Sequence, residues 1–240
     1  MVPAPLPLDQ LPGYRRRLRV APRPGSVDSE LEDDFHRMSV TLFHDGRTVT
    51  RIDTSMERVP WTTCPGAAEQ LRQTFAGVAL VDFAVRGEKR ENCTHLHDLA
   101  TLAAAHALDR EPLVYDILVS DPVDERRQVE MRLNGVRVLA WSDAGNRIVE
   151  PRELAGVALD KLRPWIESLP PERREPARLL QWGAIIAHGR TRPLDQQSDA
   201  SALGIGRCYT FQARRVAAAR RIGDIRDFSQ GTTQPLARTL

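Results

Sequence analysis

Thiols, imidazoles and a carboxylate are crowded into one short stretch of the sequence. Cys93, His95, His97 and Asp98 fall within six consecutive residues, just before the apolar run 100–108. Cys93 and His97 are four residues apart, so on a helix they share a face. A helix N-terminus lowers the pKa of a thiol and presents it to a cation or a substrate. The stretch therefore predicts a site at the start of a helix.

Two residues far from this stretch complete a candidate metal centre. His36 lies in a predicted strand, and Cys64 precedes a proline at the start of a predicted helix. One imidazole and two thiolates, from His36, Cys64 and Cys93, with water in the fourth position, describe an open zinc-type site. Iron is the alternative metal. The competing interpretation is that both cysteines are ordinary buried thiols, since free cysteine is among the most buried residue types.

General acid–base chemistry at this centre would come from neighbouring imidazoles. His95 or His97 is the expected general base, because imidazole titrates near neutral pH. Asp34 is expected to contact the substrate. A solvated strand edge, shared with Asp33, is the alternative interpretation of that carboxylate.

The segment 204–212 near the C-terminus carries a second set of candidate groups. Glycines stand beside Arg207, Cys208 and Tyr209. Arg207 is expected to bind a carboxylate or phenolate of the substrate, and Tyr209 to donate a proton. A packed helix start is the competing interpretation.

Hydrophobic patterns predict an α+β fold, with a mostly antiparallel sheet, helices packed on one side, and a helical C-terminal extension. The dipeptides Asp45-Gly46 and Asn134-Gly135 indicate tight hairpin turns. Strands are expected at 15–20, 28–43, 48–59, 78–85, 113–120, 127–133 and 136–141, and helices at 67–75, 93–109, 156–169, 171–188 and 207–221.

The same patterns suggest three consecutive parts. We expect a flexible, proline-rich arm over 1–13, an α+β core domain over 14–150, and a helical extension over 151–240 that covers the site. Hydrophobic residues make up 41% of the chain and charged residues 28%, which allows a buried core.

Charge and cysteine usage limit the partners and the compartment. The net charge of +2 argues against a dedicated nucleic-acid-binding protein. Three cysteines do not make a disulfide framework, and neither a signal peptide nor an apolar run of ~20 residues is found. We therefore expect a soluble, cytoplasmic protein that acts on a small molecule, with no nucleic acid or membrane partner; a homodimer is left open.

Several motifs, in order, resemble an uncharacterised bacterial family known only as a domain of unknown function. The resemblance covers roughly residues 10–110 and rests on Asp34-Phe-His36-Arg-Met38, Cys64-Pro65 and Cys93-Thr-His95-Leu-His-Asp-Leu99. That family is in turn distantly similar to the NifU/IscU and SufE iron–sulfur assembly fold. The similarity places His36, Cys64 and Cys93 where the scaffold has its ligands, with His36 standing in place of a cysteine.

Two functions follow from these expectations. The first is a metal-assisted lyase of retro-aldol or elimination type, such as one that releases a one-carbon aldehyde from a small oxygenated metabolite, aromatic ones included. No P-loop, GxGxxG or GxSxG motif points to another enzyme class. The second is a non-enzymatic scaffold that handles a metal or an iron–sulfur cluster, or a sulfur-transfer partner.

Overall fold

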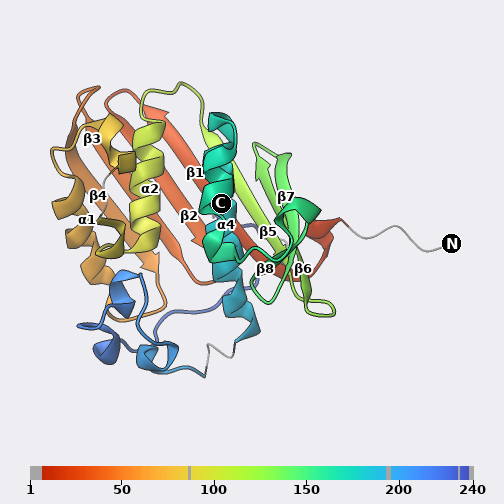
Figure 1. The fold of residues 1–240 in the computed structure, drawn as a ribbon. Coiled ribbons are helices and arrows are strands. Elements are labelled where there is room, and N and C mark those ends of the chain that lie inside the picture. The colour runs from red at the N-terminus through yellow and green to blue at the C-terminus, as the bar shows by residue number, and fades with distance from the viewer. Residues whose placement is uncertain (1–6, 86–87, 193–195, 232, 238–240) are drawn as a thin grey trace. The chain divides into compact units, whose positions relative to one another are not determined.

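The computed structural model describes residues 7–85, 88–192, 196–231 and 233–237 (Figure 1). These residues form two compact units, each made of segments that are distant in sequence. Unit 1 combines described residues of 1–17, 114–194 and 227–240, and unit 2 those of 18–113 and 195–226. This division differs from the three consecutive parts expected from the sequence, because the chain returns to unit 2 near its C-terminus.

Unit 2 contains the strands that carry the candidate site. Their order is β4-β3-β2-β1, with β1 at Gly13–Arg23, β2 at Ser26–Asp33, β3 at Arg37–His44 and β4 at Val49–Arg58. β2 pairs with β3, and β3 with β4, in antiparallel fashion. Buried and half-buried residues alternate along β3, as the two-residue period of a half-covered strand requires. The expected single strand over 28–43 is wrong, since a turn divides it into β2 and β3.

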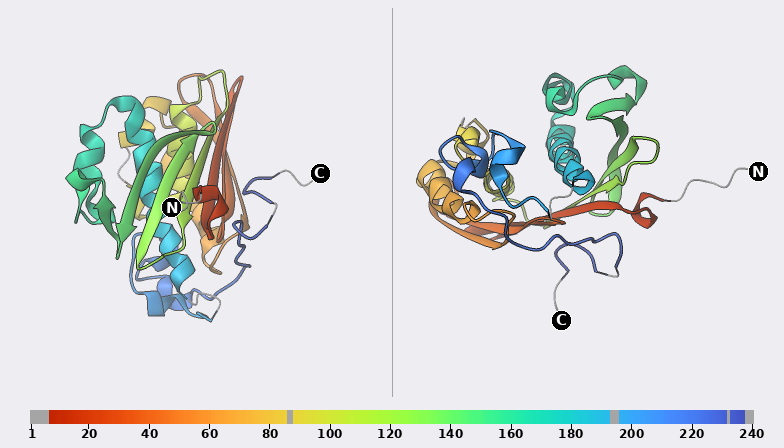
Figure 2. Two further views of the ribbon diagram at one scale, coloured as in Figure 1. Left: turned by 90° about the vertical axis from the view of Figure 1, so that its right-hand side faces the viewer. Right: turned by 90° about the horizontal axis from the view of Figure 1, so that it is seen from below.

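Two helices cover one face of these strands (Figures 1 and 2). They are α1 (Ala67–Phe75) and α2 (Thr94–Ala105). The predicted helix over 67–75 is confirmed to the residue, and α2 occupies most of the predicted 93–109. α2 packs on β2 and β3 and buries Leu96, Leu99 and Ala103 completely. Because this apolar face is buried, the orientation of α2 about its own axis is fixed. The side chains of its first turn therefore point in a fixed direction.

Unit 1 is built on the remaining strands and on α4 (Pro171–Ala187). Within unit 1, which includes residues 13–17 of β1, the strand order is β1-β5-β6-β7-β8, and the pairs from β5 to β8 are antiparallel. Asn134 and Gly135 both have positive φ in the turn between β6 and β7, which confirms the predicted hairpin. The bounds are β5 Leu113–Ser120, β6 Arg126–Leu133, β7 Val136–Ala144, β8 Arg147–Glu150 and α3 Arg163–Ser168.

The α+β class, with a mostly antiparallel sheet, is therefore confirmed. Besides the strand over 28–43, two predicted elements are wrong, and of the helix predicted over 156–169 only α3 (Arg163–Ser168) is an α-helix. The segment expected as a strand over 78–85 forms a 3₁₀ turn at Leu80–Val85, and the basic helix expected over 207–221 is replaced by 3₁₀ turns at Tyr209–Phe211 and Val216–Ala218. The basic run buries too few apolar side chains along one face to sustain a helix.

Among the described residues, none of the helices has both the length and the apolar character that crossing a membrane requires. The expected cytoplasmic location stays a prediction.

Candidate functional site

A tight turn between β2 and β3 forms the base of the candidate site. Asp33 Oδ1 accepts hydrogen bonds from the backbone amides of Phe35 at 2.8 Å and His36 at 2.7 Å. The same oxygen lies 3.0 Å from Nδ1 of His36. Aspartate favours such turns because its short side chain captures the amides that follow it. One carboxylate thus shapes the turn and orients the imidazole.

A buried arginine holds this turn from the other side. Arg58 donates to the carbonyl oxygens of Asp33 and Asp34, both at 2.7 Å, and pairs with Glu32 at 3.1 Å. The backbone amide of Arg226 also donates to the carbonyl of Asp34, at 2.8 Å. These bonds satisfy buried carbonyl groups, and they fix the backbone around His36 in one conformation.

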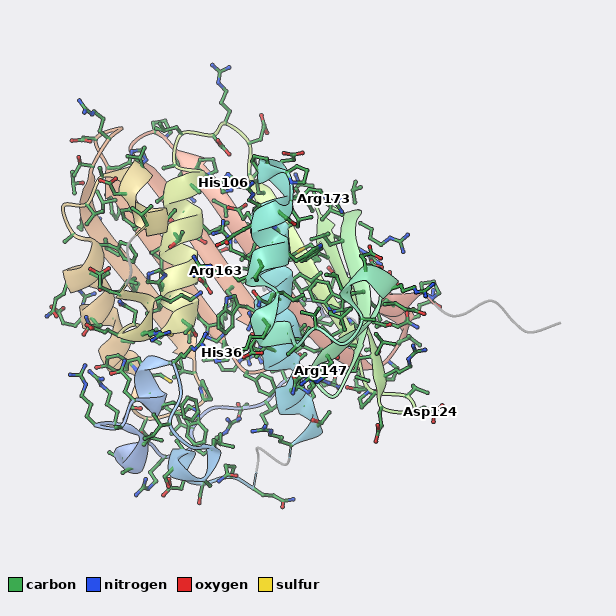
Figure 3. The ribbon with its side chains drawn as sticks, viewed as in Figure 1. His36, His106, Asp124, Arg147, Arg163 and Arg173 are labelled. Atoms are coloured by element: carbon green, nitrogen blue, oxygen red, sulfur yellow. The ribbon has the colours of Figure 1, made fainter. Side chains whose placement is uncertain are left out.

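The first turn of α2 brings a second imidazole to the turn. The rings of His36, labelled in Figure 3, and His95 lie 4.1 Å apart between centroids and are tilted by 36°. Each of Asp33, His36 and His95 offers a ligand atom within 4.8 Å of the other two. His36 and His95 keep 7% and 8% of their surface exposed, so the group lies just below the surface of unit 2.

Two imidazoles and one carboxylate form a donor set that suits a borderline divalent cation such as zinc or iron(II). Nδ1 of His36 lies 3.0 Å from Oδ1 and 3.3 Å from Oδ2 of Asp33, so this nitrogen and the carboxylate face each other.

The predicted ligand set of His36, Cys64 and Cys93 is not brought together in this way. Among the described residues, the group of Asp33, His36 and His95 is the one in which three ligand atoms approach so closely. The Asp33 turn directs His36 to His95, whereas each cysteine has a different neighbour. Cys64 Sγ contacts Thr210 Oγ1 at 3.3 Å, and Cys93 is buried at the start of α2.

The expected activation of the Cys93 thiol is also wrong. Cys93 is the N-cap residue of α2, yet its hydrogen bond to Cys208 and its burial raise its pKa well above the usual value. Cys208 is the thiol with a lowered pKa, about 7, because it accepts from Cys93 and from the backbone amides of Thr94, Tyr209 and Thr210. Burial raises the pKa of Cys64 to about 11.

His97 does not belong to the group around His36. Its ring lies 5.1 Å from that of Phe75, and neither ring nitrogen has a hydrogen-bond partner among the described residues. Burial lowers its pKa to about 4, so the imidazole is neutral at physiological pH. These surroundings describe a core side chain rather than the general base predicted for this position.

The three remaining predicted residues have different surroundings. Tyr209 lies against Gly66, where an added Cβ would meet its hydroxyl at 2.8 Å, and the guanidinium of Arg215 stands 3.6 Å from its ring centre. Arg207 is exposed, whereas Asp34 is fully buried beside the turn. The structure thus surrounds Tyr209 with packing contacts and places Asp34 next to the candidate ligands.

Sequence reasoning missed two residues of interest. The sequence alone leaves Asp33 as a strand-edge carboxylate, although an aspartate side chain that captures the following backbone amides is a common turn signal. It gives Cys208 no role, because the place of this residue depends on the return of the C-terminal segment to unit 2. No local spacing in the sequence predicts that return.

Comparison with known proteins gives one match. Residues 21–109 match the model of a family described as a protein of unknown function (DUF2889). The matched segment contains Asp33, His36 and His95 and ends before Cys208. A search of curated proteins gives no significant match. The resemblance to an uncharacterised family is supported over this segment, while the similarity to the iron–sulfur assembly fold stays a prediction.

Proposed function

We propose that Asp33, His36 and His95 bind a divalent cation, zinc in the first instance, and that the protein is a metal-assisted lyase. The observation that carries the proposal is the approach of three buried ligand atoms, from two imidazoles and one carboxylate, to within 4.8 Å of one another. Relative to the sequence-based hypothesis, His36 remains a ligand. Asp33 and His95 replace the two cysteines.

Other contacts of the protein hold the proposed ligands in position without a bound cation. Arg58 and the Asp33 turn hold the His36 backbone, and α2 holds His95 through its buried apolar face. A site whose ligands are already oriented loses little conformational entropy on binding. Three protein ligands also leave coordination positions for a substrate oxygen, as catalytic metal sites require.

When bound, a cation would polarise a hydroxyl or carbonyl oxygen of the substrate and stabilise an alkoxide or enolate. In a retro-aldol reaction, the hydroxyl gives its proton to solvent water and becomes a carbonyl, and the adjacent carbon–carbon bond breaks. The electron pair remains as an enolate, whose carbon then takes a proton from solvent. Loss of a one-carbon aldehyde from a small oxygenated substrate, aromatic ones included, fits this chemistry. His97 is not assigned as the base because its nitrogens are buried against Phe75.

Elemental analysis of untagged protein tests the metal site. We expect about one divalent cation per chain, lost in His36→Ala and in His95→Ala, and retained in Cys64→Ser. Circular dichroism of each variant checks that unit 2 remains folded. A wild-type chain that binds no cation after zinc is supplied, or a cation retained in both histidine variants, would overturn the assignment.

Aldehyde release from a panel of small aromatic and aliphatic β-hydroxy carbonyl compounds tests the lyase assignment. Activity should disappear on chelation and return when the cation is added back. Metal binding without aldehyde release from any panel member would support the site but contradict the reaction.

The alternative of an iron–sulfur scaffold is supported by the presence of Cys64, Cys93 and Cys208 in the same unit. A labile cluster needs several thiolates around one point. The three cysteines do not form a group with all sulfur atoms within 4.8 Å, as judged over the described chain. Iron and acid-labile sulfide, measured in the same samples, would favour the scaffold.

A further inference from the structure

Strand β4 lies at an edge of the sheet, because β3 is its one neighbour in the strand order of the described chain. Both ends of β4 are covered. At the start, the amide of Val49 donates to the carbonyl of Val78 at 3.0 Å, and the amide of Gly77 donates back at 3.1 Å. Just beyond the end, the amide of Ile222 donates to the carbonyl of Pro60 at 3.0 Å. An open edge can therefore lie only between these two contacts.

Hydrogen bonds at the two ends of β3 show which backbone groups of β4 point outward. The amide of Asp33 donates to the carbonyl of His36 at 2.9 Å, and the amide of His44 donates to the carbonyl of Gly25 at 3.0 Å. Both histidines therefore direct their backbone groups to β2. Because this direction alternates along a strand and the register with β2 is unbroken, the odd-numbered residues of 37–43 face β4. Their partners in β4, which therefore face β3, are Arg51, Asp53 and Ser55.

The alternate residues of β4 expose their backbone groups. Ile52, Thr54 and Met56 direct their amides and carbonyls away from β3, and no hydrogen bond to these groups is found in the part of the chain that the structure describes. A row of unpaired amides and carbonyls along an edge strand is a template for pairing with a further strand. The middle of β4 therefore has the backbone groups that an added strand would need.

We propose that β4 pairs in antiparallel fashion with β4 of a second copy of this chain, about a two-fold axis that passes beside Thr54. In this register Thr54 lies opposite its own counterpart, and Ile52 lies opposite Met56 of the second copy. All three outward residues of each chain then exchange both backbone hydrogen bonds with the other chain. The proposal does not depend on the metal site or on lyase activity.

Exposed charges on β4 are complementary in this register. It brings Arg51, whose side chain is 61% exposed, close to Glu57 of the second copy, whose side chain is 60% exposed. Both side chains lie on one face of the sheet, since Arg51 stands 3.8 Å from the ring centre of Phe43, and Glu57 pairs with Arg37 at 2.9 Å. The two-fold axis repeats the pair, so that each dimer contains two such contacts.

Neighbouring registers are less favourable. A shift by two residues in one direction places Asp53 opposite its own counterpart, and a shift in the other direction places Asp53 opposite Glu57 of the second copy. Like charges that lie directly opposite each other destabilise a strand pair. Larger shifts leave fewer outward residues paired, and in one direction they run the second copy into the segment that covers Val49.

Sedimentation equilibrium of the full chain, from micromolar to millimolar concentration, tests the proposal. The mean mass should rise from one chain towards two, because a short strand pair forms a small interface and hence a weak, concentration-dependent dimer. A mass of one chain at every concentration would overturn the proposal.

Two proline variants test whether the edge of β4 is the interface. In Thr54→Pro the lost amide points outward, so the monomer should stay folded and the dimer should disappear. Ser55→Pro is the matched control, because its amide faces β3 and its loss should lower the stability of the monomer in urea denaturation. A dimer that persists in folded Thr54→Pro would show that β4 is not the interface.

Charge exchange tests the register without a change to the backbone. Arg51→Glu and Glu57→Arg should each raise the dissociation constant of the dimer about tenfold, because each brings like charges together, and the double variant should restore it. Arg163→Glu, at an exposed pair with Glu167 in unit 1, makes the same change in net charge and should have no effect. Weakening that persists in the double variant would contradict the proposed register.

Discussion

Asp33 and His36 are joined both through the backbone and through their side chains. The carboxylate oxygen that approaches the imidazole at 3.0 Å also accepts the backbone amide of His36 at 2.7 Å. Ring orientation and backbone conformation therefore depend on a single atom. A change at Asp33 should affect folding and ligand binding together, and the choice of substituent can separate the two effects.

We predict that Asp33→Ala lowers the free energy of unfolding by about 3 kcal/mol, because two buried amides lose their acceptor. Asp33→Asn keeps an acceptor oxygen and should cost much less. Because Asp33→Asn removes the negative charge, its zinc affinity should still fall, by about 10–100-fold. Urea denaturation and zinc titration measure the two quantities.

Asp45 provides the matched control for this pair of variants. It accepts the amides of Arg47 and Thr48 in the same manner, but in an exposed hairpin turn. Asp45→Ala should therefore reduce stability less than Asp33→Ala and leave zinc affinity unchanged. If the two variants lost the same free energy of unfolding, burial of the Asp33 turn would not contribute to stability.

Replacement of Arg58 by methionine should destabilise unit 2 strongly. The side chain is 8% exposed, and its loss removes one donor from each of the carbonyls of Asp33 and Asp34 and one partner from Glu32. We expect about 3 kcal/mol, typical of breaking a buried ion pair. Arg163→Ala, which removes an exposed pair with Glu167, should have little effect in the same denaturation assay.

His97 should make stability fall at acidic pH. Its pKa is about 6.5 when unfolded and about 4 in the folded protein, so between these values the unfolded chain binds more protons. By linkage, the free energy of unfolding decreases as pH falls from 6.5 to 4, by at most roughly 3 kcal/mol from this residue. His97→Leu should flatten the pH profile in this window.

The control for His97 is His106→Gln, which removes an imidazole bonded to Asp109 at 2.7 Å rather than one buried without partners. That variant should leave the acid-side decrease in stability intact. If His97→Leu and wild type show the same slope between pH 4 and 6.5, then His97 is not the residue responsible.

Gly183 should be intolerant of alanine although it lies inside helix α4. An added Cβ would come within 2.8 Å of two side-chain carbons of Ile117 on β5. Alanine gains about 1 kcal/mol in helix propensity, but overpacking typically costs 1–3 kcal/mol, so roughly 1 kcal/mol of net destabilisation is expected. The penalty should shrink in an Ile117→Val background. Stabilisation by Gly183→Ala would contradict this packing.

Local signals in the sequence were sufficient for much of the fold. The helix at 67–75 and the strand at 113–120 were predicted to the residue, because apolar period and flanking turn residues agree there. The segments over 28–43 and 207–221 failed for a different reason. In 28–43, the side chain of Asp33 forms a turn that ends the strand. In 207–221, the charged residues favour a helix locally, but that helix would have no apolar face to bury.

The candidate site was predictable only in part. His36 and His95 were identified from their residue types, and the structure places their rings side by side. The third proposed ligand could not be identified from the sequence. Residues 32–34 are all carboxylates, and only the geometry of the turn distinguishes Asp33 from its two neighbours. The contact of Cys64 with Thr210 depends on long-range topology, which short motifs do not predict.

The three proposed ligands lie within one continuous stretch of chain, from Asp33 to His95, and this stretch falls inside the segment matched by the family model. Cys208 instead belongs to the C-terminal segment, which lies outside the match. No proposed ligand comes from that segment, so Cys208→Ser should leave the bound cation in place.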